Sequence, residues 1–165
     1  MRVLVAGIGN VFLGDDGFGV EVVARLAGRE LPDGVEVADF GIRGFDLAYA
    51  LMDGYDAAVL VDALPRGQPA GTLCLLEPRL DDVDRAPPLD SHAMHPMAVL
   101  AMVRQHGGTL PLTWIVGCEP GVIDPDGAGH MGLSQPVAAA VDAAADLVEA
   151  VVRRVAAPAV ATRRV

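Results

Sequence analysis

Short apolar runs alternate along the chain with segments in which apolar residues recur every three or four positions. The runs end at glycine or at an acid, which is typical of buried strands, and the spaced segments are typical of helices that pack one face on a sheet. We expect strands over 2–6, 34–39, 57–62, 71–77 and 112–117, and helices over 17–28, 45–52, about 91–105 and 134–155. This alternation predicts an α/β fold.

The fourth predicted strand should run against the others. Only residues 63–70 join it to the third strand, whereas a parallel crossover needs a dozen or more residues. Residues 78–90, with four acids and three prolines, and residues 118–133, rich in Gly and Pro, are expected to be loops. The sequence thus predicts a mostly parallel five-stranded sheet with one antiparallel strand.

The length and composition predict one compact unit. A chain of 165 residues suits one domain, expected over 1–155, and residues 156–165 lack periodicity and are expected to be a flexible tail. Val, Leu, Ile and Ala would supply the core, because hydrophobic residues make up 52% of the chain and aromatic residues only 4%. We expect a monomer.

Cysteine usage and apolar run lengths predict a cytoplasmic protein. Cys74 and Cys118 lie in separate apolar segments, and the first strand starts almost at Met1, so we expect a reducing compartment and no targeting segment. Apolar runs stay well short of the roughly 18 residues needed to span a bilayer. We therefore expect no membrane association.

The charge balance argues against nucleic-acid partners. Twelve arginines, no lysine and 22 acidic residues give a net charge of −10, which repels phosphate backbones at long range. A cationic metal centre or a basic peptide remains compatible with this charge.

Acidic residues follow several predicted strands. Asp39 and Asp62 end the second and third predicted strands, and Asp16 and Glu119 lie in the loops after the first and fifth. Parallel strands carry their functional loops at one edge of the sheet. His92, near the start of the helix before the fifth strand, is expected to join them. Such a cluster can bind a divalent metal or exchange protons in hydrolysis, whereas a lone strand-end Asp more often only caps a turn.

Several neighbours compete with these candidates. His95 lies three residues beyond His92, so spacing alone does not choose between them. His130 lies in a glycine-rich loop and is expected to be exposed. We expect Asp15 to do no more than stabilise a helix dipole, and Cys118 and, with greater weight, Cys74 to be core residues rather than nucleophiles.

Two common catalytic motifs are incomplete here. Gly7-Ile8-Gly9 resembles the start of a dinucleotide loop, but Phe12 occupies the position of the third glycine, so we expect no nucleotide cofactor. The chain holds two serines, Ser91 and Ser134, and neither lies in Gly-x-Ser-x-Gly. Ser134 is instead expected to cap the last helix.

One longer pattern is specific. The stretch from Gly7 to Gly19 is similar to the opening signature of the hydrogenase maturation protease family, and the resemblance continues to about Val155. It includes Asp39-Phe40-Gly41-Ile42-Arg43-Gly44, the strand ending in Asp62, Ser91-His92, Val116-Gly117-Cys118-Glu119-Pro120 and Met131-Gly132-Leu133-Ser134.

The resemblance implies a three-layer α/β/α sandwich with strand order 2-1-3-5-4 and an antiparallel fourth strand. It implies that Asp16, Asp62 and His92 contact nickel or a surrogate metal and that Asp39 aids function. The implied activity is an endopeptidase that removes a C-terminal extension from the large-subunit precursor of a nickel-iron hydrogenase after nickel insertion. The nickel would be carried by the precursor.

Two alternatives remain at this point. One is a checkpoint protein that binds the nickel-loaded precursor without cutting it. The other is an enzyme similar to peptidyl-tRNA hydrolases, which the acidic charge disfavours because such an enzyme needs a basic surface for tRNA.

Overall fold

The computed structural model describes residues 1–86, 94–121, 123 and 131–157. Five strands form one sheet in the order β2-β1-β3-β5-β4. Strand β4 pairs antiparallel with β5, and the other pairs are parallel. The predicted order and the antiparallel fourth strand are confirmed. The strands are β1 (Val3–Ile8), β2 (Val35–Gly41), β3 (Ala57–Ala63), β4 (Leu73–Leu76) and β5 (Leu112–Cys118).

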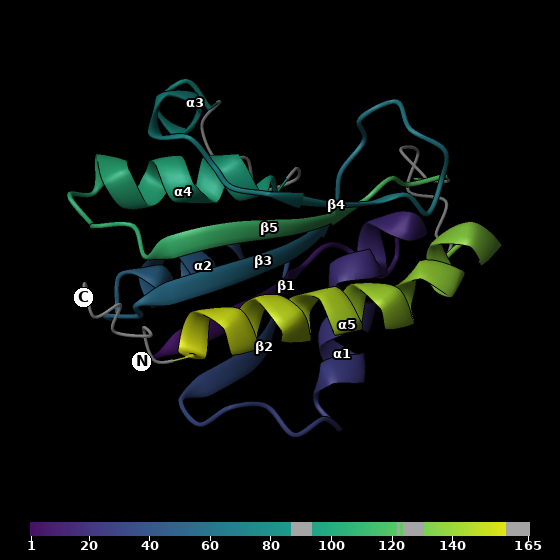
Figure 1. Ribbon diagram of the computed structural model, residues 1–165. Coiled ribbons are helices and arrows are strands. Elements are labelled where there is room, and N and C mark those ends of the chain that lie inside the picture. Colours follow the sequence, from purple (N-terminus) through teal and green to yellow (C-terminus); the bar gives the residue numbers. More distant parts are fainter. Residues whose placement is uncertain (87–93, 122, 124–130, 158–165) are drawn as a thin grey trace, which may run out of the picture.

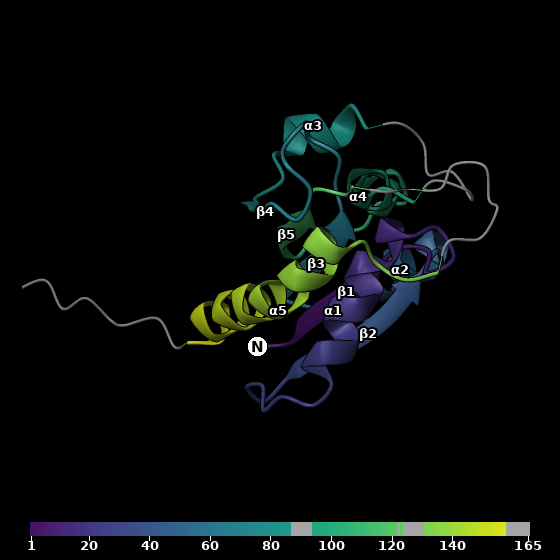
Figure 2. The same ribbon diagram turned by 90° about the vertical axis from the view of Figure 1, so that its right-hand side faces the viewer.

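Helices cover both faces of the sheet, which makes the predicted three layers (Figures 1 and 2). Helices α1 and α5 pack on one face, and α2 and α4 pack on the other, with α3 beside α4. The helices are α1 (Phe18–Leu26), α2 (Gly44–Leu51), α3 (Leu80–Asp84), α4 (Pro96–Gln105) and α5 (Gln135–Ala156), and a 3₁₀ turn, η1 (Asp15–Gly17), precedes α1.

The central strands are buried on both faces, which explains why they appear in the sequence as unbroken apolar runs. Every residue of β1 and β3 is buried. Successive side chains point to opposite faces, so Val3 and Val5 pack toward α1 and α5 while Leu4 and Ala6 pack toward α2 and α4.

Helix α1 lies directly on the strands because of Gly19. A Cβ atom there would lie 2.1 Å from the carbonyl oxygen of Val61 and 2.3 Å from that of Ile8. Only a residue without a side chain allows this approach, which brings η1 and α1 against the carboxyl ends of β1 and β3.

Two element boundaries differ from the sequence prediction. The expected loop over 78–90 contains the short helix α3, whose Val83 is buried in the core on the α4 side. Helix α4 begins at Pro96, after His95, whose ring nitrogen Nδ1 accepts a hydrogen bond from the Met97 amide at 3.1 Å. This cap places the start of α4 later than the sequence predicted. His92, expected near that start, lies outside the described residues.

Within the described part of the chain, no helix is both long enough and apolar enough to cross a membrane. The expected tail, apart from Ala156 and Ala157, also lies outside the described residues.

Candidate active site

Asp16 is held at the sheet edge by a tight loop after β1. Gly9 has a φ of +131°, and a Cβ there would lie 1.7 Å from the carbonyl oxygen of Asp16, so the loop folds back closely only because Gly9 lacks a side chain. The backbone amide of Asn10 donates to Asp16 Oδ2 at 2.8 Å. One carboxylate oxygen of Asp16 is thereby fixed in a partly buried position.

Asp62 lies at the carboxyl end of β3, where a charged side chain is unusual. Only 3% of it is exposed, and it follows Leu60 on the strand face that packs toward α2 and α4. Its Oδ1 accepts a hydrogen bond from the Ala63 amide at 2.8 Å. A purely turn-capping Asp needs no such burial, so this position favours a chemical role.

The two carboxyl groups affect each other's charge. Burial raises the pKa of Asp62 well above its ordinary value, and the negative charge of Asp16 raises it further. Burial also raises the pKa of Asp16, against the hydrogen bond from Asn10, which lowers it. Two carboxylates that disfavour simultaneous ionisation attract a shared proton or a cation, so the structure brings together two of the predicted site residues.

Asp39 lies at the carboxyl end of β2, opposite Gly7 of β1. It is exposed and lines a hollow of about 310 Å³ together with Asn10, Phe12 and Arg43. Asp39 is therefore at the predicted edge of the sheet, in a hollow beside the loop that holds Asp16.

Of the candidate histidines His92, His95 and His130, the structure describes only His95. His92 and His130 lie outside the described residues, so their positions stay predictions. His95 is described, but as the cap of α4 and in a separate cavity, and burial lowers the pKa of its ring. Within the described ranges, no group of three His, Cys, Asp or Glu side chains lies close enough to hold a metal ion.

Asp15 lies in the first turn of η1, as the dipole interpretation requires, but it does more than stabilise a helix dipole. Its carboxylate is fully buried and accepts hydrogen bonds from the amides of Gly121 and Ser134 at 2.8 and 2.6 Å, and from the Ser134 hydroxyl at 2.8 Å. Ser134 does lie at the N-cap position of α5, but its hydroxyl donates to Asp15 rather than capping the helix. Asp15 thus ties both ends of the loop that follows β5 to the turn that carries Asp16.

Glu119, another of the converging acids, also holds a loop. Its buried carboxylate accepts hydrogen bonds from the amides of Arg66 at 2.7 Å and Gly67 at 3.2 Å. Both residues belong to the connection from β3 to β4. The position of Glu119 after a strand made it a candidate site residue. Its role is structural, because the neighbouring backbone amides donate to its carboxylate.

The cysteines behave mainly as predicted. Cys118 is completely buried, and burial raises the pKa of its thiol to about 12, so at neutral pH it is a protonated core residue. Cys74, expected to be the more buried of the two, is only partly buried on the edge strand β4.

Sequence and structure comparisons identify relatives of the whole domain. The family model described as hydrogenase maturation protease matches residues 20–151. A putative hydrogenase maturation protease of Methanocaldococcus jannaschii is 34% identical over 88% of this chain and 93% of its own, and the hydrogenase 2 maturation protease of Escherichia coli is 32% identical over 93% and 92%. The chain belongs to the hydrogenase maturation protease family.

The fold agrees with this assignment. The hydrogenase maturating endopeptidase HybD from E. coli superposes with a TM-score of 0.76 at 29% identity, covering 94% of each chain. The protein is therefore a peptidase of hydrogenase maturation, and the carboxylate pair at its sheet edge is the candidate active site. The family match includes Asp39, Asp62 and His92 but begins after Asp16.

Proposed function

We propose that this protease removes a C-terminal extension from the large-subunit precursor of a nickel-iron hydrogenase after nickel has been inserted. The observation that carries the proposal is the pair of coupled carboxyl groups, Asp16 and Asp62, in a chain of this family. In this proposal nickel is part of the substrate and marks the precursor as ready for cleavage.

The donor chemistry suits a transient contact with a divalent ion. Asp62 is a buried carboxyl whose charge is disfavoured by burial and by Asp16, and a cation between them would relieve both costs. Asp16 Oδ2 accepts a hydrogen bond from the Asn10 amide, and among the described residues no hydrogen bond engages its second oxygen, which could contact a ligand. With His92 as a third donor, the set would combine the carboxylate and imidazole ligands that nickel accepts.

The same residues support hydrolysis of the peptide bond. A carboxyl with a raised pKa is a stronger base than an ordinary Asp, because burial and a neighbouring negative charge favour its protonated form. We propose that the Asp62 carboxylate takes a proton from the attacking water and then gives it to the leaving amine, and that Asp16 orients the reacting group. Metal polarisation of the same carbonyl is compatible with these roles.

The test is cleavage of a nickel-loaded large-subunit precursor, measured by intact mass. Wild type is compared with Asp16→Ala, Asp62→Ala and His92→Ala, and exposed Asp33→Ala and His106→Ala are the matched controls. Loss of a C-terminal peptide with wild type and both controls, but with none of the three site variants, supports the proposal.

Nickel dependence and the checkpoint alternative are separated in the same assay. Cleavage of a nickel-free precursor at the same rate would contradict the role of nickel as a mark. Tight binding of the loaded precursor without any change in mass would contradict proteolysis and favour the checkpoint. Thermal melts of every variant separate loss of chemistry from loss of fold.

A further inference from the structure

A second cavity lies on the same sheet face as Asp62. It has a volume of about 390 Å³, and its sheet-side wall includes Leu64, Leu76 and Ile115. Leu64 is two residues beyond Asp62, so both project toward α4, and Ile115 and Leu76 follow on β5 and β4. The cavity thus lies toward the β4 edge, on the sheet face to which Asp62 also points.

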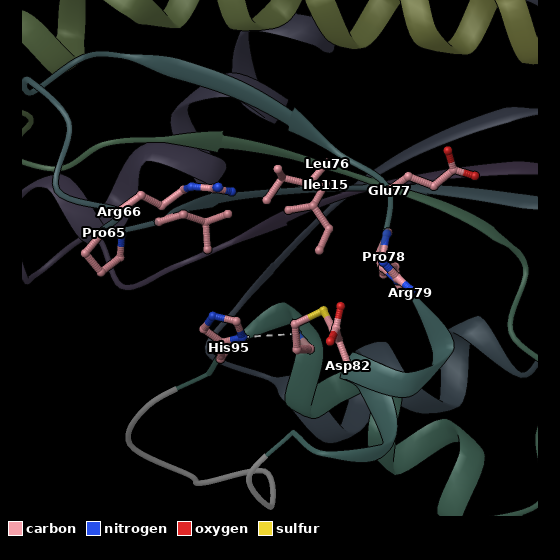
Figure 3. Close-up of a pocket in the computed structure, with 11 residues that line it drawn as sticks. Pro65, Arg66, Leu76, Glu77, Pro78, Arg79, Asp82, His95 and Ile115 are labelled. Atoms are coloured by element: carbon pink, nitrogen blue, oxygen red, sulfur yellow. Dashed lines mark hydrogen bonds between the residues drawn. The ribbon is translucent and has the colours of Figure 1, made fainter.

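The lining of this cavity is mainly apolar, with charges at its border. Pro65, Pro78 and Met97 complete the apolar surface. Figure 3 shows Arg66 extending along the sheet side toward Leu76, while Asp82 and His95 lie on the opposite, helical side. A cavity that joins an apolar interior to a few separated polar groups is suited to one large side chain of a peptide.

Arg66 supplies a positive charge that contributes to lowering the pKa of Glu119 but lies outside the salt bridges of the described residues. Its backbone amide donates to Glu119, which holds this part of the loop in place. Among the described residues, its guanidinium forms no salt bridge, although the chain as a whole is strongly acidic. A peptide carboxylate is the complementary group, and Asp82 on the far wall disfavours the reverse orientation.

His95 adds a donor of fixed direction. Because its Nδ1 accepts a hydrogen bond from the Met97 amide, the neutral ring carries its proton on Nε2. That N–H can donate to a backbone carbonyl of a bound peptide. The cavity therefore offers one apolar site, two arginines and one neutral donor; Arg66 lies on the sheet side, whereas Arg79 lies beside Asp82 (Figure 3).

We propose that this cavity is a substrate subsite that binds an extended peptide segment carrying a large aliphatic side chain beside a carboxylate. The aliphatic group would fill the space between Leu76, Ile115 and Met97, and the carboxylate would pair with Arg66. This inference rests on the proposed function, because it assigns the cavity to the peptide that the Asp16–Asp62 site would cleave. The carboxylate is either an acidic side chain or the free C-terminus.

Binding can be measured without proteolysis. The protein has six methionines, so selective ¹³C-methyl labelling gives a simple NMR spectrum. Met97 reports on the cavity, and Met52, near the amino ends of β3 and β5, is the internal control. The probes are Ac-Gly-Leu-Glu-Gly-amide and Ac-Gly-Gly-Leu as its free acid. Ser replaces Leu in matched peptides, Gln replaces Glu in the first, and an amide replaces the terminal acid in the second.

We expect saturable shifts of the Met97 methyl with at least one Leu-carboxylate peptide and none with its Ser-substituted match. Which of the two peptides binds identifies the carboxylate source. Arg66→Glu should abolish the shift, whereas Arg85→Glu, an exposed arginine outside the cavity, should leave it unchanged. Equal shifts with the Leu and Ser peptides, or undiminished binding by Arg66→Glu, would overturn the proposal.

Precursor cleavage gives the second readout. Filling the cavity by Met97→Trp should raise the KM for the precursor about tenfold or more with a smaller effect on kcat, because burial of one Leu side chain is worth about that factor. Met52→Trp is the control. If Met97→Trp and Arg66→Glu both cleave the precursor with an unchanged KM, the subsite proposal is overturned and the proposed function is not. If the peptides bind but neither wild type nor any variant cleaves the precursor, the proposed function is contradicted and the subsite proposal is not.

Discussion

Burial of the Asp62 carboxyl lowers the stability of the folded protein, and a role in function explains why it is there. An almost completely buried carboxyl next to a second carboxylate is a poor choice for stability, and its one hydrogen bond from Ala63 lowers the pKa less than burial and Asp16 raise it. Asp15 and Glu119 are buried as well, but each accepts several hydrogen bonds from backbone amides. The contrast distinguishes two structural carboxylates from a chemically available one.

This cost predicts how stability depends on pH. In the folded state the pKa of Asp62 lies above its unfolded value of about 3.9, so the folded protein binds the proton more tightly. The favourable contribution of the protonated form is present below the unfolded pKa and is lost as pH rises through the folded pKa. Asp62→Asn should therefore be more stable than wild type at pH 7 and no more stable near pH 4, while losing activity.

Urea unfolding at a series of pH values from 4 to 8 measures the difference, and one kcal/mol would also appear as about 2–4 °C in Tm for a domain of this size. Asp33→Asn, an exposed carboxylate, controls for the general effect of removing a negative charge. A wild type that stays more stable than Asp62→Asn at neutral pH would show that the buried carboxylate has a stabilising partner instead.

At the scale of elements, the sequence predicts what the hydrophobic pattern determines. The five strands and the antiparallel direction of β4 could be expected, the latter because the short link before β4 disfavours a parallel crossover, whereas the strand order was expected only from the family resemblance. Helix α3 was missed because its acids dominate the segment, while the one buried side chain, Val83, gives no periodic signal. The late start of α4 was missed because it depends on His95 acting as a side-chain cap.

The packing of α1 on the sheet is set by one residue whose importance the sequence pattern does not reveal. Gly19→Ala would place its Cβ 2.1 Å from the carbonyl oxygen of Val61, so the helix must move away from β1 and β3. We expect a loss of about 1–3 kcal/mol or more in the free energy of unfolding, as for other overpacked sites. Because η1 directly precedes α1, precursor cleavage should fall as well.

Gly28→Ala is the matched control, since a Cβ atom at this position, just beyond the same helix, would have no neighbouring atom within 4 Å. Its free energy of unfolding should stay within about 0.5 kcal/mol of wild type. Urea unfolding of both variants checks the prediction, and it fails if Gly19→Ala is as stable as Gly28→Ala.

For the molecule as a whole, two hydrophobic cores share one sheet, and the site lies where the sheet ends. The candidate acids could be predicted because parallel strands deliver their carboxyl ends to one edge. Their division into chemical and structural groups could not, because it depends on which backbone amides long-range contacts bring to Asp15 and Glu119. The cavity beside Leu64 is equally invisible in sequence, since it is built from four separate segments.

The extent of the folding unit follows from the last helix. Helix α5 contributes Val148, Val151 and Val152 to the core on the α1 side, and Val155 packs at its margin. In the part of the chain that the structure describes, these contacts end at Val155, so we expect a chain that stops after Ala157 to unfold at the same urea concentration as the full chain. A chain that stops after Ala150 loses two buried valines and should be roughly 3–6 kcal/mol less stable. The chain that stops after Ala150 also lacks Arg153, which donates to the Glu30 carbonyl at 2.8 Å. The Arg153→Ala variant measures this part of the lost stability separately. A lower midpoint for the chain ending at Ala157 would place residues 158–165 in the folded unit and contradict the predicted boundary.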